Sequence, residues 1–250
     1  AIIREDSGHR RPAGVVTFLD SRLSVCAELC RTLAVNGVDP ALLAIKSKAV
    51  VNALIPEYVP CSLAFDARND PEAELRQMLD QSRHGLIAKP ALAAGAKGYR
   101  EMATAAELLP ATQLVDEQLS PALRPYDLVV QERILGELVS LEGFVAKGNL
   151  HFLGVTGRRK QGNSESVFLF PYDDRIDPTA LATAKMAVTA LVQRSRFQNG
   201  FFHTEFIVNG SEAWLIDANF GRPGGANLAE VFSVTFGVDN WNVRQTITVT

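Results

Sequence analysis

Acidic and amide side chains gather on one face of a predicted β-hairpin that runs from Phe201 to Asn219. Side chains alternate between the two faces of a strand. The even positions of this segment are mostly apolar, whereas odd positions carry His203, Glu205, Asp217 and Asn219. Two carboxylates and an amide oxygen suit Mg²⁺, with Mn²⁺ as the other option, because these ions prefer oxygen ligands. We therefore predict a metal site at Glu205, Asp217 and Asn219; the alternative for this segment alone is a solvated polar face.

The loop of this hairpin decides whether the two acids can meet. A two-residue Asn209-Gly210 turn would place Glu205 and Asp217 on opposite faces of the sheet. A five-residue loop would bring them directly opposite each other, and a three-residue loop would make them diagonal neighbours. We therefore predict a loop of odd length.

The elements that must position this hairpin fall into two groups. In the first group strands alternate with helices, and from Asp127 onward successive strands predict an antiparallel sheet. The first group comprises a strand over 14–18, a helix capped by Asp20 or Ser21 with apolar residues at helical spacing from Leu23 to Leu33, helices over 41–54 and 72–81, an extended segment over 62–65 and a strand over 85–88. The second comprises strands over 128–131, 138–146, 151–156, 167–170, 201–208 and 213–218, and a helix from Pro178 to about Arg196 capped by Asp177.

Composition excludes several classes of protein. The 250 residues, 47% of them hydrophobic and 21% charged, can form one large or two small globular domains. A net charge of −3 argues against a nucleic-acid partner. No apolar run is long enough to cross a membrane and no signal segment is present, so we expect a cytoplasmic protein with no membrane partner. The three cysteines are expected to be reduced thiols.

The two ends suggest a longer protein. The chain opens with Ala1, its first fifteen residues show no clean period, and it stops on a β-like run that ends at Thr250. We expect material to be missing at both ends.

At the hairpin the chain resembles the ATP-grasp superfamily, whose members place a Glu, an acid twelve residues later and an Asn two residues further on as metal ligands. Glu205, Asp217 and Asn219 match that spacing. The loop that starts at Arg222 and contains Gly224 and Gly225 is similar to the family's Arg-x-Gly-Gly phosphate and product loop. Two departures stand out, because the second acid is Asp where Glu is usual and Arg222 follows Asn219 by three residues rather than two.

Upstream motifs follow in the family's order, although each is weak alone. Lys48 and Lys89 resemble the two lysines that bind nucleotide phosphates; taken singly, each would be read as a solvated surface residue. The segment 95–98 resembles the family's flexible glycine-rich loop over the phosphates; its residues are Gly95, Ala96, Lys97 and Gly98. The segment 131–134 resembles the family's hinge that receives adenine; its residues are Gln131, Glu132, Arg133 and Ile134. The resemblance implies that backbone groups of Arg133 and Ile134 face the adenine ring.

The acid that binds ribose in many members is replaced here by Leu138, so Glu137 or Glu142 would have to substitute. The basic run of Arg158, Arg159 and Lys160 would supply charge to the reacting phosphate, or form a solvated turn. His203, Gly224 and Gly225 would contact substrate, with Arg222 stabilising the intermediate; a structural histidine is the alternative for His203.

The resemblance implies an α/β (α+β) ATP-grasp fold in which two α+β subdomains grip ATP. It implies the end of an N-terminal domain at 1–40, a small subdomain at 41–131 and a metal-binding subdomain at 132–250. The implied enzyme is a ligase that joins a carboxylate and an amine through an acyl phosphate, of the amino-acid or dipeptide ligase branch. Its partners would be small-molecule substrates, and homodimers are common among such proteins. The alternatives are a carboxylase or purine-pathway enzyme on the same scaffold, or a non-catalytic ATP-binding scaffold.

Overall fold

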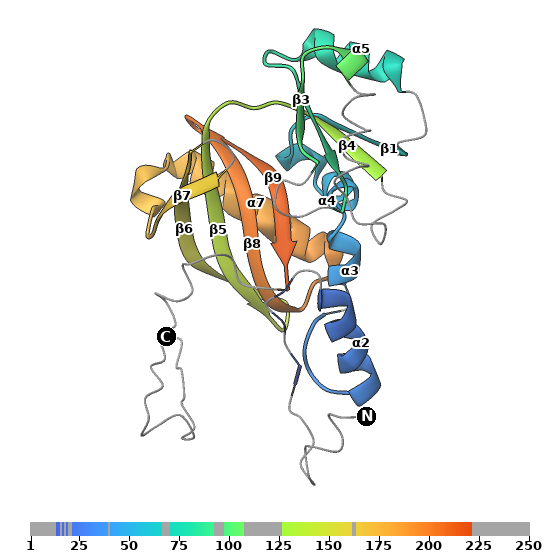
Figure 1. Ribbon diagram of the computed structural model, residues 1–250. Helices are drawn as coiled ribbons and strands as arrows, with labels where there is room; N and C mark the ends of the chain where they lie inside the picture. Colours follow the sequence, from blue (N-terminus) through green and yellow to red (C-terminus); the bar gives the residue numbers. More distant parts are fainter. Residues whose placement is uncertain are drawn as a thin grey trace.

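The computed structural model describes residues 14, 15, 17, 19, 22–39, 41–66, 71–92, 98–107, 127–161 and 164–221. Two antiparallel sheets form two lobes (Figure 1). The smaller sheet has the order β1-β4-β2-β3 and consists of β1 (Ser62–Asp66), β2 (Leu86–Pro90), β3 (Arg100–Met102) and β4 (Asp127–Glu132). Helix α5 (Glu72–Gln81) packs on it through Leu75, which is fully buried against Leu86 and Val130.

The larger sheet has the order β7-β6-β5-β8-β9, with every neighbouring pair antiparallel. Its strands are β5 (Glu137–Ala146), β6 (Asn149–Gln161), β7 (Ser164–Leu169), β8 (Asn199–Asn209) and β9 (Glu212–Phe220). Helix α7 (Pro178–Ser195) covers one face of this sheet, behind the strands in the view of Figure 1. The fold is thus mixed α and β, as predicted. Both sheets are antiparallel, whereas the sequence predicted antiparallel pairing only from Asp127 onward.

The two faces of the larger sheet differ in chemistry. The face toward α7 carries Val139, Leu141, Phe206 and Leu215, all at most 2% exposed. These side chains form one core with apolar residues of α7 such as Val188. Because side chains alternate along each strand, the intervening residues of β5, β8 and β9 fall on the opposite, polar face.

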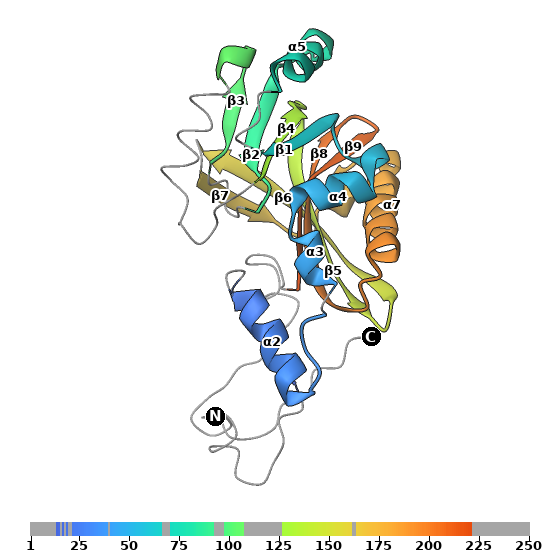
Figure 2. The same ribbon diagram turned by 90° about the vertical axis from the view of Figure 1, so that its right-hand side faces the viewer.

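Two short helices join the lobes. Helix α3 (Leu42–Ile45) ends at Ile45 with Lys46 as its C-cap, and α4 (Lys48–Leu54) starts after Ser47, whose φ of −81° and ψ of 121° are extended. The single helix predicted over 41–54 is therefore wrong. Helix α4 packs against β1 and β4 of the smaller sheet and against β9 of the larger one (Figure 2). The break places Lys48 at the start of a helix that lies between the sheets.

Most other predicted elements are confirmed within a few residues. Helix α2 (Leu23–Leu33) buries Cys26 and Cys30, and the Asp177 side chain caps α7 by accepting from the Thr179 amide at 2.8 Å. The sequence did not predict β3 or the short 3₁₀ helices η2 (Pro56–Tyr58), η3 (Ala105–Glu107) and η5 (Asp173–Arg175).

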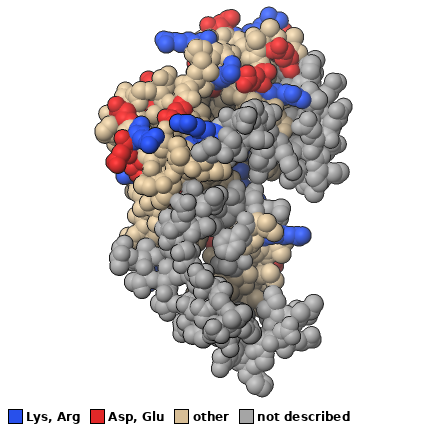
Figure 3. Space-filling model, turned by 60° about the vertical axis from the view of Figure 1, so that its left-hand side comes forward, with Lys and Arg blue, Asp and Glu red and all other residues tan. Residues whose placement is uncertain are grey.

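At the predicted strand over 14–18, Gly14 makes an isolated parallel bridge with Asn36, and parts of that segment lie outside the described residues. Acidic and basic side chains are interspersed over the described part of the face in Figure 3, in keeping with the small net charge. No helix among the described residues is long and apolar enough to cross a membrane.

Candidate active site

The hairpin of β8 and β9 brings the two predicted metal-binding acids together by a different route from the one predicted. Its loop has two residues, Gly210 and Ser211, because Asn209 pairs with Glu212. The prediction of an odd-length loop is therefore wrong.

A β-bulge supplies the missing residue instead. Phe206 pairs with Leu215 but Glu205 pairs with Asp217, which leaves Ile216 as the extra residue of β9. The bulge shifts the register by one, so Glu205 and Asp217 lie directly opposite each other, with His203 opposite Asn219.

Two lysines from outside the larger sheet reach this bulge. The Nζ of Lys48, at the start of α4, lies 3.0 Å from Asp217 Oδ1. The Nζ of Lys89, on β2 of the smaller sheet, donates to the carbonyl oxygen of the bulged residue Ile216 at 2.8 Å. Burial lowers the pKa of Lys89 to about 8, against the opposing effect of the Asp217 charge. The two lobes therefore present two amines and two carboxylates to one another.

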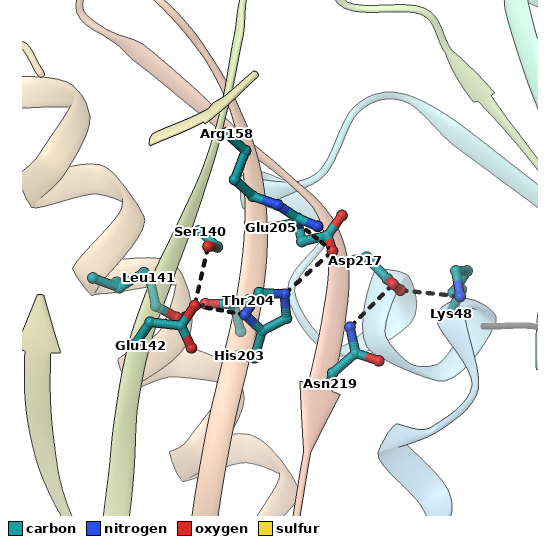
Figure 4. Close-up of polar contacts among 10 residues, drawn as sticks. All are labelled: Lys48, Ser140, Leu141, Glu142, Arg158, His203, Thr204, Glu205, Asp217 and Asn219. Atoms are coloured by element: carbon teal, nitrogen blue, oxygen red, sulfur yellow. Dashed lines mark hydrogen bonds and ion pairs between the residues drawn. The ribbon is translucent and has the colours of Figure 1, made fainter. Parts of the chain in front are cut away.

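Glu205 lies between two cationic groups. Its Oε1 is 2.5 Å from Arg158 Nη1 and 3.3 Å from His203 Nε2 (Figure 4). Burial by itself would raise the pKa of Glu205, but the hydrogen bond with His203 and the Arg158 charge lower it to about 2. Glu205 is thus held as a carboxylate, the form in which it could bind a metal ion.

His203 lies between two acids on the same polar face. Its Nδ1 is 2.6 Å from Glu142 Oε1, which also accepts from Ser140 Oγ at 3.0 Å. Burial acts to lower the pKa of His203, yet the hydrogen bonds with Glu142 and Glu205 raise it to about 9. A charged imidazole in this place balances two carboxylates.

The donor set fits a small dication. Glu205 and Asp217 are paired across the bulge, and their charges are met in this structure by Arg158, His203 and Lys48. Asn219 Nδ2 donates to Asp217 Oδ2 at 3.2 Å, so the amide would have to turn over to present its oxygen. The described residues contain no cluster of three or more His, Cys, Asp or Glu side chains suited to a metal. Two carboxylates and one amide oxygen are of the ligand types that Mg²⁺ prefers, so the metal site predicted at Glu205, Asp217 and Asn219 stays a prediction.

The predicted adenine hinge lies at the end of β4 and in the segment that follows. Gln131 is buried at 3% exposure. The Arg133 amide donates to Gly85 O at 2.9 Å. The contact with adenine that the sequence assigns to the backbone of Arg133 and Ile134 stays a prediction. The Arg133 side chain pairs with Glu101 at 3.2 Å. A Cβ on Gly136 would lie 2.3 Å from the carbonyl oxygen of Val208, so a side chain there would separate the hinge from β8.

The two candidates for ribose binding lie apart along β5. Glu137 Oε1 accepts from Tyr172 Oη at 2.5 Å, and Glu142 faces His203. The cation that reaches Glu205 is Arg158, with a 7% exposed side chain, whereas its neighbour Arg159 is exposed. Alternation along β6 accounts for this difference.

Several predicted site residues lie outside the part of the chain that the structure describes. The side chain of Lys160 is outside the described part of the chain, as are Gly95, Ala96, Lys97, Arg222, Gly224 and Gly225. Gly98 is described and has a φ of +73°, a backbone conformation suited to glycine.

Ser140 is a site residue that sequence reasoning passed over, whereas Arg158 belongs to the basic run at 158–160 that the sequence singled out. Both lie on the polar face, where Ser140 pairs with Glu205 and Glu142 pairs with His203. The period of two along β5 contained this signal, since residues 140 and 142 share a face. It could not be used without the register of β5 against β8.

Similar solved structures share the arrangement of these elements. An L-amino acid ligase from Bacillus licheniformis matches 92% of this chain with a TM-score of 0.68 and 18% identity, over 54% of its own length. A biotin carboxylase from Campylobacter jejuni matches 88% with a TM-score of 0.70 and 14% identity, over 51% of its length. A D-alanine–D-alanine ligase from Bacillus anthracis matches 77% with a TM-score of 0.57 and 11% identity, over 62% of its length. The chain has the ATP-grasp fold.

At these identities the likeness shows the ATP-grasp fold alone. No protein-family model matches the chain, and no curated protein matches it in sequence. The chain spans about half the length of the first two of these structures. Within the ATP-grasp fold of this chain, the polar face of the larger sheet and the two lysines form the candidate active site.

Proposed function

We propose that this protein is a Mg²⁺-dependent ligase that uses ATP to join a carboxylate to an amine, with an amino acid as one substrate. One observation carries the proposal. Glu205 and Asp217 oppose each other across the bulge, while Lys48 and Lys89 arrive there from outside the larger sheet. Carboxylates beside amines from a second lobe are the groups needed to hold a metal-bound polyphosphate.

Similar structures support the choice of chemistry. Two of them are named as an L-amino acid ligase and a D-alanine–D-alanine ligase. A third, a carboxyaminoimidazole ribonucleotide synthase from Aspergillus clavatus, is complexed with ATP; it matches 80% of this chain with a TM-score of 0.60 and 14% identity. Amide formation from a free carboxylate requires activation, and transfer of the ATP γ-phosphate to the carboxylate provides it.

The nucleotide would lie between the lobes. Lys48 and Lys89 would neutralise phosphate oxygens as point charges, and the 95–98 loop would cover the phosphates. The 131–134 hinge would hold adenine. Glu205, Asp217 and Asn219 would hold Mg²⁺, whose charge would offset that of the phosphates. The corresponding proposal for organisation is a small subdomain at 41–131 and a metal-binding subdomain at 132–250, preceded by the end of an N-terminal domain.

Activation and amide formation would then need positioning and charge neutralisation rather than a protein nucleophile. Arg158, whose buried side chain pairs with Glu205, would meet negative charge on the transferred phosphoryl group. Arg222, with the backbone of Gly224 and Gly225, would stabilise charge on the acyl phosphate. An amine then displaces phosphate from the acyl phosphate, which yields the amide, ADP and phosphate. Closure of the glycine loop would exclude water that could hydrolyse the intermediate.

A screen of amino acids, singly and in pairs, tests the proposal. We expect Mg²⁺-dependent release of ADP and phosphate with at least one pair, together with an amide detected by mass. Release that requires both compounds identifies a ligase. ATP binding without amine-dependent ADP release would contradict the proposal and indicate a non-catalytic scaffold.

A carboxylase on the same fold is the second candidate. It is favoured by the biotin carboxylase match, whose TM-score of 0.70 is similar to the 0.68 of the L-amino acid ligase. Such an enzyme would release phosphate in response to bicarbonate rather than to a second amino acid. Adding bicarbonate as one component of the screen distinguishes the two.

A further inference from the structure

Glu142 carries a buried oxygen to which no described residue donates a hydrogen bond. Its side chain is 4% exposed. Oε1 accepts from Ser140 Oγ at 3.0 Å and faces His203 Nδ1 at 2.6 Å. Oε2 is buried and has no partner among the residues that the structure describes. A buried carboxylate oxygen without a donor is costly, so this atom points to a donor that comes from outside the described chain.

This oxygen belongs to the polar face of the larger sheet. Glu142 on β5 pairs with His203 on β8, which pairs with Asn219 on β9. The adjacent row contains Ser140, Glu205 and Asp217. Figure 4 shows Glu142 on the side of His203 away from Asp217. Two strand spacings, roughly 10 Å, separate the backbones of Glu142 and Asn219. This separation can be bridged by a small amino acid and its polar contacts when the carboxylate reacts near the proposed metal site.

The neighbours of Glu142 contact Oε1 and leave Oε2 without a donor among the described residues. His203 directs one ring nitrogen to Glu142 Oε1 and the other to Glu205, and Ser140 also donates to Oε1. Both residues therefore act as positioning residues, because they hold the carboxylate by one oxygen and direct the other elsewhere. An ionised carboxylate only accepts hydrogen bonds and pairs best with a charged donor.

We propose that Glu142 binds the amino group of the amino acid that donates the carboxylate. The inference rests on the proposed function. The ammonium brings the charge and the donors that Oε2 lacks. The donor is favoured over the acceptor because the acceptor's amine must lose its proton to attack, whereas an ammonium held by a buried carboxylate keeps it. This role replaces the ribose contact predicted for Glu142 from the sequence.

The proposal predicts selection against carboxylates that lack an amino group. A site that pairs a buried polar group with a substrate N–H rejects an analogue without it, because the buried group is left unpaired. The deamino analogue of the donor still has a carboxylate to be phosphorylated, so comparing the two isolates the amino group.

The test uses the full chain with MgATP and the donor found in the screen. The donor is the amino acid whose amino group is still free in the product. ADP release is measured with this donor and with its deamino analogue. In Glu142→Gln we expect the KM for the donor to rise about 10- to 100-fold, because the variant loses one charge-assisted hydrogen bond to the donor's ammonium. The KM for ATP should stay within about twofold, and the preference for the donor over its analogue should largely disappear.

Glu212→Gln is the matched control, since Glu212 is an exposed acid at the loop end of β9. It should leave both KM values unchanged. Glu142→Asp replaces the Gln variant in the test if that variant does not fold. It keeps the negative charge but shortens the side chain by one methylene, which moves the carboxylate away from the donor's amino group. It should also raise the donor KM and spare that for ATP.

The outcomes separate the two proposals. Amine-dependent ADP release with an unchanged preference for the donor in the Glu142 variants overturns the role of Glu142 alone. An equal loss for the donor and its deamino analogue also overturns it, because the residue then serves structure rather than amino-group binding. The absence of amine-dependent release from the wild-type protein overturns the proposed function and this inference together.

Discussion

The two faces of the larger sheet are built from the same strands but differ in side-chain chemistry and in the role that we assign to them. On the α7 face, apolar side chains such as Phe206 and Leu215 fill the space against a helix and are almost completely buried. On the polar face, Glu142, His203 and Glu205 are also largely buried, yet they contact one another through charged hydrogen bonds. Burial alone therefore does not distinguish a core from an active site. The distinction lies in whether the buried groups are apolar and pack against one another, or are charged and able to bind a ligand.

The largest expected effect comes from removing a metal ligand on the polar face. Asp217→Ala should lower amine-dependent ADP release about 10³-fold or more, roughly 4 kcal/mol of transition-state stabilisation. Its free energy of unfolding should fall by less than about 2 kcal/mol, since the partly exposed pair with Lys48 contributes little. Steady-state kinetics and urea unfolding measure the two quantities. Retained activity would refute the assignment of Asp217, and Glu212→Ala on the same strand is the control.

The opposite pattern is expected on the apolar face. Phe206 is 0% exposed, so Phe206→Ala should lower the free energy of unfolding by about 3–5 kcal/mol through lost burial and a cavity. The folded fraction should keep its KM for ATP. Met186→Ala on the exposed side of α7, where Met186 is 51% exposed, should change stability little. A loss below about 1 kcal/mol in Phe206→Ala would contradict the assignment of this face as the core.

The charges of the polar face should make stability depend on pH when Mg²⁺ is absent. The pKa of His203 is raised from 6.5 to about 9, so its stabilising contribution is complete below pH 6.5 and is lost as pH rises through 9. The stability advantage of the wild type over His203→Gln should shrink by up to about 3 kcal/mol across this window. Urea unfolding in EDTA at several pH values measures it. A difference independent of pH would mean that His203 is neutral in the fold.

The smallest expected effect lies outside both faces. Asp177→Ala removes the side chain that caps α7 and should cost about 1 kcal/mol without changing the KM for any substrate. Asp174→Ala is the control, because Asp174 is exposed and lies in η5. A change in KM with Asp177→Ala would show that α7 and the polar face are coupled more closely than their separate roles suggest.

Local patterns were sufficient to predict most helices and strands. The apolar stripe after Pro178 predicted α7, and period-two alternation predicted β8 and β9 together with the acids on one face. These features depend on residues near one another in the chain, which is why a single sequence can indicate them. The break between α3 and α4 was missed, since the Ser47 conformation accompanies the placement of α4 between two sheets.

By itself the sequence determined which residue types are available to the site: two acids and an asparagine on neighbouring strands, two lysines and a histidine. Tertiary structure decided how they meet. The loop has two residues, which would have separated Glu205 from Asp217, and the bulge at Ile216 restores their pairing. The structure also selected Arg158 rather than Arg159 as the partner of Glu205 and directed Glu142 toward His203. The reason is physical: alternation sets the face of a residue within its own strand, but register, which depends on distant segments, sets which residues become neighbours.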